Sequence, residues 1–268
     1  MLRVSIITIC RNSAATIERA VLSVQSQTYP NIEHIIIDGK SDDGTIDIIR
    51  KYDANIAFWS SEPDRGIADA YNKGLQRAGG DVIGILNSDD YYLGDRIKAV
   101  MDLFAAAPDL GFVFGDLEYV DDNGAVLFTQ LGDPDYTSSI RYTMPSLTHP
   151  TMFVRRDVYG RVGGFDERYK VAMDYELLLR VFRAGFRGRY LPVSLAAMQV
   201  GGNSDRRCFE GYRETMQAAV EQGFPFIPAW IYCQYKCLKT KIRRRLEAGN
   251  LMWLVKAYRQ RVMRRFRY

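Results

Sequence analysis

The sequence predicts an α/β protein with a mostly parallel central sheet flanked by helices. Apolar, β-branched runs recur four times in the first 90 residues, and each is followed by a polar turn and then by apolar residues at helical spacing. Strand, turn and helix in repetition is the pattern of a parallel sheet with helices on its faces. The 268 residues fit one large domain or one domain with an appendage, and a hydrophobic content of 47% is ordinary for a globular protein.

The first half of the chain contains the four predicted parallel strands, at residues 3–10, 33–38, 56–59 and 83–86. The run 3–10 is apolar with no helical stripe, which is typical of a strand buried on both faces. Ile17 opens a helical pattern that ends before Pro30, and Asn12 or Ser13 is a plausible N-cap. Because the carboxyl ends of parallel strands meet at one edge of a sheet, the turns that follow these strands should lie together.

The second half predicts a β-hairpin, a helix and a separate C-terminal segment. Residues 112–120 and 126–129 flank an Asn-Gly turn, which is a hairpin signal. Residues 149–155, 186–191 and 195–200 are further extended candidates. Asp174 lies near the start of an apolar-faced helix, where the helix dipole alone could account for a carboxylate. We expect a catalytic domain at 1–223 and a basic helical tail at 224–268.

The segment Asn87-Ser-Asp-Asp90 places two adjacent carboxylates at the end of a buried strand. Neighbouring carboxylates repel each other, and Mg²⁺ or Mn²⁺ would offset that repulsion through the oxygen ligands they prefer. Taken alone, the segment could equally cap the next helix through Asp90 or Asp95. Four more acidic residues follow the other strands, which favours a metal and diphosphate site and leaves the capping role to Asp95. They are Asp38, Asp43, Glu62 and Asp64.

Six motifs follow one another along the chain in a fixed order. They are Thr8-Ile-Cys-Arg-Asn12, Asp38-Gly-Lys-Ser-Asp-Asp-Gly-Thr45, Glu62-Pro-Asp-Arg-Gly66 with Ala70-Tyr-Asn-Lys-Gly74, Asn87-Ser-Asp-Asp90, Met173-Asp174 and Gly201-Gly-Asn-Ser204. These motifs resemble those of the inverting glycosyltransferases of family 2, which have the GT-A fold, and the resemblance covers roughly residues 3–204.

The resemblance implies a nucleotide-diphosphate sugar as donor, a glycan or lipid-linked saccharide as acceptor, and a role in cell-surface polysaccharide synthesis. Asp38 would contact the nucleobase, Asp174 would be the catalytic base, and Asp89 with Asp90 would hold Mg²⁺ or Mn²⁺. The donor-binding residues that it implies are Thr8, Arg11, Asn12, Asp38, Asp64, Lys73 and Asp89.

The sequence departs from the family pattern at two positions. Asn87 replaces the first Asp of the D-x-D metal motif, and Met173 replaces the Glu of the E-D pair. A non-catalytic nucleotide-sugar-binding or scaffold protein is therefore one alternative. A nucleotidyltransferase is another, but it would need a glycine-rich phosphate loop after the first strand, and residues 5–13 contain no glycine.

The C-terminal 39 residues are strongly basic. Twelve Lys and Arg against Glu247 give +11 from Trp230 onward, which leaves −7 on residues 1–229 of the total +4. A basic amphipathic segment containing Trp and Tyr suits an anionic membrane surface. The alternatives are a helix packed on the catalytic domain, a homo-oligomer contact, or a nucleic-acid arm. The acidic body argues against nucleic acid as a partner.

Cysteine spacing and the N-terminus bear on location. Cysteines at 10, 208, 233 and 237 have neither disulfide-framework nor zinc spacing, which suits a reduced compartment. We see no leader pattern and no apolar run long enough to span a bilayer. The expected location is cytoplasmic, peripheral at the inner face of the cell membrane.

Overall fold

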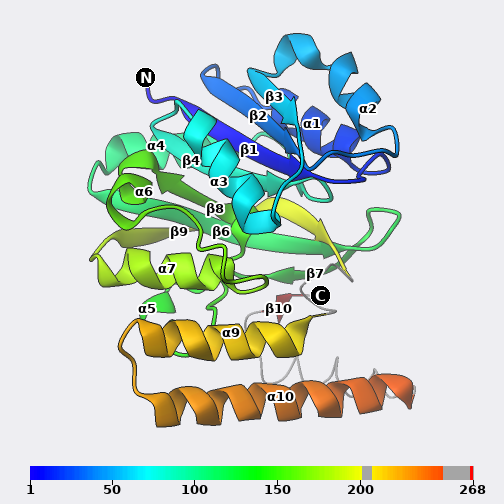
Figure 1. Ribbon diagram of the computed structural model, residues 1–268. Helices are drawn as coiled ribbons and strands as arrows, with labels where there is room; N and C mark the ends of the chain where they lie inside the picture. Colours follow the sequence, from blue (N-terminus) through cyan, green and yellow to red (C-terminus); the bar gives the residue numbers. More distant parts are fainter. Residues whose placement is uncertain (201–206, 250–265, 268) are drawn as a thin grey trace.

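The computed structural model describes residues 1–200, 207–249 and 266–267. Within these residues one curled sheet runs in the order β10-β7-β6-β8-β4-β1-β2-β3, with β9 beside β6 and β5 beside β9. Helices cover both faces of the sheet, and two further helices lie below it in Figure 1. The predicted α/β class is confirmed.

The first half of the sheet is parallel. β1 (Val4–Cys10), β2 (Ile32–Asp38), β3 (Phe58–Ser61) and β4 (Val82–Asn87) lie side by side in the order β4-β1-β2-β3. The register pairs Cys10 with Asp38, and Ile9 with Asn87, so these strands end level with one another. We call this edge the rim, and it consists of the turns 11–16, 39–44, 62–66 and 88–90.

Two buried layers hold the sheet between its helices. α1 (Ile17–Gln25) and α4 (Ile97–Ala106) pack on one face with the apolar side chains of β1 and β4. α3 (Ile67–Arg77), α6 (Arg156–Val162) and α7 (Met173–Arg183) contribute to the core on the other face, and α2 (Thr45–Lys51) packs beside α1. A Cβ at Gly74 would lie 2.3 Å from Cγ2 of Ile7, so its absence allows α3 to approach β1 closely.

The second half of the sheet is mainly antiparallel. The predicted hairpin is confirmed as β6 (Leu110–Val120) and β7 (Val126–Gln130), and β8 (Met152–Arg155) lies between β6 and β4. The two extended segments predicted after α7 form a single strand, β9 (Arg187–Gln199), which also pairs with β5 (Tyr91–Tyr92). The short helices of this part and the C-terminal strand are α5 (Tyr136–Ser139), η2 (His149–Thr151) and β10 (Phe266–Arg267), and one further short helix, η1 (Asp53–Asn55), precedes β3 in the first half.

The N-termini of two helices differ from the prediction in their caps. α1 begins at Ile17 as expected, but its N-cap residue is Thr16 and not Asn12 or Ser13, because the chain first makes a turn in which the Thr16 N–H donates to the Ser13 carbonyl. Asp95 does not cap α4 and instead accepts hydrogen bonds from Thr28. The cap of α4 is the buried Gln27, whose Oε1 accepts from the backbone N–H groups that open the helix.

The last two helices form successive layers beyond α7. α9 (Cys208–Glu221) packs on α7, and α10 (Phe226–Ala248) packs on α9, so that α10 lies outermost in Figure 1. The predicted boundary at 223–224 falls in the turn between them, and the division into two domains stays a prediction. The predicted turn 201–204 and most of the segment 251–268 lie outside the described residues. Among the described helices, none combines the length and apolar character that crossing a membrane requires.

Candidate active site

Hydrogen bonds tie the turns of the rim to one another. The Asn12 N–H donates to Oγ of Ser41 at 2.7 Å, and Oδ1 of Asn12 accepts from the Asp42 N–H at 3.1 Å. Asn12 and Lys40 have φ values of 51° and 62°, and no other non-glycine residue of the described ranges has a positive φ. Such left-handed residues cost free energy and concentrate at functional sites. These two residues therefore indicate that the turns after β1 and β2 belong to a functional site.

Asp38 organises two of these turns from a fully buried position. Its carboxylate accepts from the Ser41 N–H at 2.9 Å and from the hydroxyls of Ser41 and Ser61 at 2.5 and 2.6 Å. These bonds fix the turn after β2 and the end of β3. A direct contact between Asp38 and a nucleobase stays a prediction.

Arg11 and Asp64 meet over Gly39. A Cβ on Gly39 would lie 2.3 Å from Oδ2 of Asp64 and 3.4 Å from Cβ of Arg11, so only glycine leaves room for this approach. The first carbon of the Arg11 side chain and the carboxylate of Asp64 thus both lie close to Gly39 on the rim. Thr8 is different, because it lies inside the sheet at 0% exposure, with Oγ1 3.0 Å from Nε2 of His34. The structure does not bring Thr8 to the rim.

Lys73 is held by the turn that follows β3. Its ammonium donates to the Pro63 carbonyl at 2.8 Å and lies 3.0 Å from Glu62 and 3.6 Å from Asp69. These contacts occupy the side chain and offset its charge. Lys73 therefore stabilises the 62–66 turn, and its contact with a donor stays a prediction.

The segment after β4 places its two carboxylates in opposite environments. Asp89 is exposed, whereas Asp90 is 1% exposed and accepts from Nδ2 of Asn87 at 3.1 Å. Oδ1 of Asn87 in turn accepts from the Tyr71 hydroxyl at 2.6 Å. An amide at position 87 can donate to Asp90, which a carboxylate there could not do at neutral pH. This contact gives a physical reason for the departure at Asn87.

The chemistry of this segment fits a divalent cation. Burial, and then the charge of Asp89, raises the pKa of Asp90 well above its usual range, and Oδ1 of Asp90 has no hydrogen-bond partner in the described residues. A cation nearby would relieve both conditions. The described residues contain no cluster of three or more metal-ligating side chains. One or two carboxylates suffice, however, when substrate phosphates complete the coordination of Mg²⁺.

Tyr71 connects the rim to α7. Its ring packs on His149 and Phe165, with centroid distances of 5.1 and 4.9 Å. Burial raises the pKa of Tyr71 well above its usual value, and the negative charges of three carboxylates add to this effect. They are Asp90, Asp174 and Asp89. The charges of the predicted base and of the two predicted metal ligands thus act on the same phenol.

Asp174 is the second residue of α7 and has a perturbed acidity. Its Oδ1 accepts from the Tyr175 N–H at 2.7 Å. Burial raises the pKa of Asp174 to about 6, against the opposing effect of backbone hydrogen bonds, and the charge of Glu214 also raises this pKa. At neutral pH the side chain is mostly ionised and still basic enough to accept a proton, which is the requirement for a general base.

Glu214 of α9 was not anticipated from the sequence. Its carboxylate accepts three backbone hydrogen bonds of 2.8–2.9 Å, from the N–H groups of Lys170, Val171 and Ala172. These residues lead into α7, so Glu214 fixes the backbone immediately before Asp174. More than 40 residues separate Glu214 from this turn, and no local pattern points to it.

Asn72 of α3 is a second unanticipated residue. Its side-chain amide donates to the carbonyl of Phe165 and accepts from the N–H of the same residue, both at 2.8 Å. This pair holds the 163–167 loop against α3. The signal was present, since Asn72 lies in the Ala70–Gly74 motif, but its role becomes visible only in three dimensions.

Comparisons with known proteins identify the family of the chain. The family model "Glycosyl transferase family 2" matches residues 5–163. An uncharacterized glycosyltransferase of Mycobacterium tuberculosis is 33% identical over 187 residues, which are 66% of this chain and 68% of the relative. A hyaluronan synthase of Pasteurella multocida is 30% identical over 176 residues, which are 65% of this chain and 18% of that longer protein.

A solved structure matches nearly the whole chain. The mannosyltransferase PcManGT from Pyrobaculum calidifontis, in complex with GDP-Man and Mn²⁺, superposes with a TM-score of 0.68 and 20% sequence identity, covering 97% of this chain and 82% of its own. The fold is therefore the GT-A fold of glycosyltransferases. Because the family model matches more than half of the sequence, the protein belongs to glycosyl transferase family 2.

Proposed function

We propose that the protein is a metal-dependent, inverting glycosyltransferase. It moves a sugar from a nucleotide-diphosphate donor to a hydroxyl group of a glycan or lipid-linked saccharide. The observation that carries the proposal is the hydrogen-bonded series Tyr71–Asn87–Asp90 beside the exposed Asp89, together with the effect of the Asp174 charge on the same Tyr71 phenol. Family membership and the GDP-Man and Mn²⁺ of PcManGT support the donor and the metal.

Asp174 performs the central step. An acceptor hydroxyl is a poor nucleophile until a positioned base removes its proton, and a carboxylate of pKa about 6 is suited to this task near neutral pH. Direct attack of the activated hydroxyl on the anomeric carbon is a single displacement, so the configuration of the sugar inverts. Glu214 keeps the start of α7, and thus the base, in place.

The rim binds the donor in this proposal. Arg11, Asn12 and Asp64 line the turns next to the strand ends, and Asp89 meets an incoming cation first because it is exposed. Asp90 lies beneath it and adds negative charge. A divalent ion bound there would neutralise the charge that the departing diphosphate acquires.

The acceptor and the location complete the proposal. The hyaluronan synthase relative supports a product of the polysaccharide class, and we propose cell-surface polysaccharide synthesis on this basis. We also propose a peripheral location at the cytoplasmic face of the cell membrane, where a lipid-linked acceptor would be available.

Asp174→Asn tests the base assignment. We expect transfer of sugar to fall by at least about a hundredfold, because general-base catalysis typically contributes that much, while binding of UDP or GDP with Mn²⁺ is retained. Asp157→Asn, which changes an exposed carboxylate of α6, is the matched control and should leave both measurements unchanged.

The same experiment separates the alternatives. A scaffold protein would bind nucleotide sugar but would release no nucleotide, whether unchanged or with Asp174→Asn. A nucleotidyltransferase would release pyrophosphate from a nucleoside triphosphate and a sugar phosphate. Full transfer activity in Asp174→Asn would refute the proposed role of Asp174.

A further inference from the structure

The outward face of α10 is a stripe of exposed apolar side chains. Its members recur every three or four residues, so they lie on one side of the helix. They are Ile227, Ile231, Tyr235, Leu238 and Ile242, with exposed fractions of 68%, 55%, 51%, 59% and 51%. We call these five residues the outer stripe. Large apolar side chains exposed in a continuous row are a mark of an interaction surface.

The opposite face of α10 is fixed to the protein. Ala229, Cys233 and Thr240 are buried at 2%, 5% and 6% exposure, and the Thr240 hydroxyl lies 2.9 Å from that of Tyr212 on α9. In Figure 1, α10 is the outermost helix, with α9 between it and α7. The outer stripe therefore faces away from the rest of the fold.

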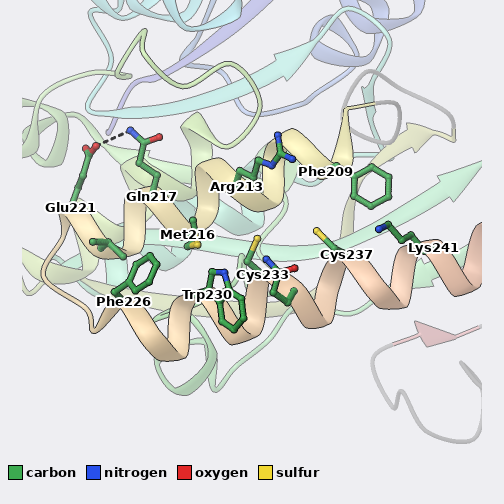
Figure 2. A pocket seen from close by; sticks show the side chains of 12 residues that line it. Phe209, Arg213, Met216, Gln217, Glu221, Phe226, Trp230, Cys233, Cys237 and Lys241 are labelled. Carbon is green, nitrogen blue, oxygen red and sulfur yellow. Dashed lines mark hydrogen bonds between the residues drawn. The ribbon is translucent and has the colours of Figure 1, made fainter.

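A groove between α9 and α10 extends this apolar surface. It has a volume of about 930 Å³ and includes Phe209 and Met216 of α9 and Phe226 and Trp230 of α10. Figure 2 shows these side chains along one side of the two helices. Trp230 is 47% exposed and lies between the groove and the outer stripe on the helix. The stripe and the groove are thus parts of one surface.

The charge of α10 indicates what this surface meets. Phe226–Ala248 contains six Lys and Arg and a single acidic residue, Glu247. Lys241 and Arg245 are exposed, and the helical repeat places them beside the stripe. Two copies of such a helix would bring like charges together, which disfavours a homodimer through this face. An anionic lipid surface has the opposite charge and accepts the apolar side chains.

We propose that α10 lies flat on an anionic lipid bilayer, with the outer stripe and Trp230 in the boundary between headgroups and acyl chains and with Lys241 and Arg245 at the lipid phosphates. The described helices include none that could cross the bilayer, which agrees with a helix lying in its plane. The inference deepens the proposed function, because it gives a structural basis for the proposed membrane location. It rests on the proposed function only for the choice of that location.

The test uses the full chain and measures flotation with vesicles. The vesicles consist of phosphatidylcholine, either alone or mixed with phosphatidylglycerol. We expect binding to the mixed vesicles, weaker binding at high salt, and much weaker binding to phosphatidylcholine alone. Leu238→Asp should weaken binding by at least about tenfold, because a charge replaces an apolar side chain that would be buried in the bilayer.

The matched control is Leu22→Asp, which makes the same change at an exposed leucine of α1, 47% exposed. We expect this variant to float as the unchanged protein does. Ile231→Asp provides a second position in the stripe, and circular dichroism verifies that each variant is folded. Tryptophan fluorescence should shift to shorter wavelength with mixed vesicles, and the shift should be smaller in Trp230→Phe.

Three results would overturn the proposal. The first is no binding to mixed vesicles by the unchanged protein, and the second is equal binding by Leu238→Asp and the unchanged protein. The third is a dimer in light scattering that Leu238→Asp dissociates, with no vesicle binding, which would assign the stripe to a second copy. Nucleotide binding without vesicles is independent of all three, so loss of membrane binding is distinguishable from failure of the proposed enzyme function.

Discussion

At the scale of single residues, Asp89 and Asp90 are neighbours in the chain with separate tasks. Asp89 faces solvent, and Asp90 is buried against Asn87 with a pKa raised well above its usual range. We therefore expect Asp89 to contact the metal directly, with Asp90 having a smaller effect.

Two asparagine variants separate these tasks. We expect Asp89→Asn to weaken Mn²⁺-dependent binding of UDP or GDP by about tenfold or more, since it removes a ligand charge. Asp90→Asn should change that affinity less than threefold or so, because Asp90 is buried beneath Asp89 and does not meet the incoming cation directly. Calorimetric titration with and without EDTA measures both. A larger loss in Asp90→Asn than in Asp89→Asn would reverse the assignment.

At the scale of elements, α9 contributes to the acidity of the proposed base at the start of α7. The charge of Glu214 is among the causes that raise the pKa of Asp174 to about 6. Asp174 must be ionised to act as a base, so activity should decrease as the pH falls through that value. In Glu214→Gln the repulsion is removed, and the pKa of Asp174 should decrease.

The pH profile of kcat/KM tests this connection. We expect the acid limb to have its midpoint near pH 6 in the unchanged protein and at a lower pH in Glu214→Gln. Glu210→Gln removes the same charge one turn earlier on α9 and should leave the midpoint in place, because Glu210 pairs with Arg207 instead. A uniform loss of activity with an unmoved midpoint would show that Glu214 acts only through the backbone.

α4 depends on a side chain from another element. Oε1 of Gln27 accepts from the N–H groups of Arg96 and Ile97, and its Nε2 donates to the carbonyls of Ser23 and Gly94. Gln27→Ala leaves these buried groups without partners, and we expect it to lower the free energy of unfolding by about 2 to 3 kcal/mol.

Urea unfolding of two variants measures this effect. Gln25→Ala is the control, because it changes the same residue type on α1 and the amide nitrogen of Gln25 has no hydrogen-bond partner among the described residues. Its cost should remain below about 1 kcal/mol. Equal losses in the two variants would contradict the capping role of Gln27.

The difference between local and distant contacts explains what the sequence could predict. The rim was predictable, because each acidic turn directly follows an apolar run, and parallel pairing of β1, β2 and β4 brings such turns together. The contacts of Glu214 and Gln27 were not, because they join segments about 40 and 70 residues apart. Thr8 belongs to the same motif as Asn12 but lies within the strand, and the motif does not distinguish the two positions.

At the scale of the whole molecule, the donor should stabilise the fold through the rim. The rim joins turns from four strands of the central sheet, so a ligand that binds only the folded form raises the free energy of unfolding of the sheet as a whole. At a hundredfold excess over its Kd, a single ligand contributes about 2.7 kcal/mol. For a chain of this size that corresponds to roughly 5 to 10 °C in Tm.

A thermal-shift panel of UDP-, GDP- and dTDP-sugars with Mn²⁺ would identify the nucleotide. We expect one base to give the full shift, EDTA to remove most of it, and Asp89→Asn to reduce the shift even with Mn²⁺ present, because the metal links Asp89 to the diphosphate. Leu238→Asp should show the same shift as the unchanged protein, since α10 is separated from α7 by α9. Equal shifts with and without metal would contradict a metal bridge, and no shift with any donor would contradict the proposed donor site.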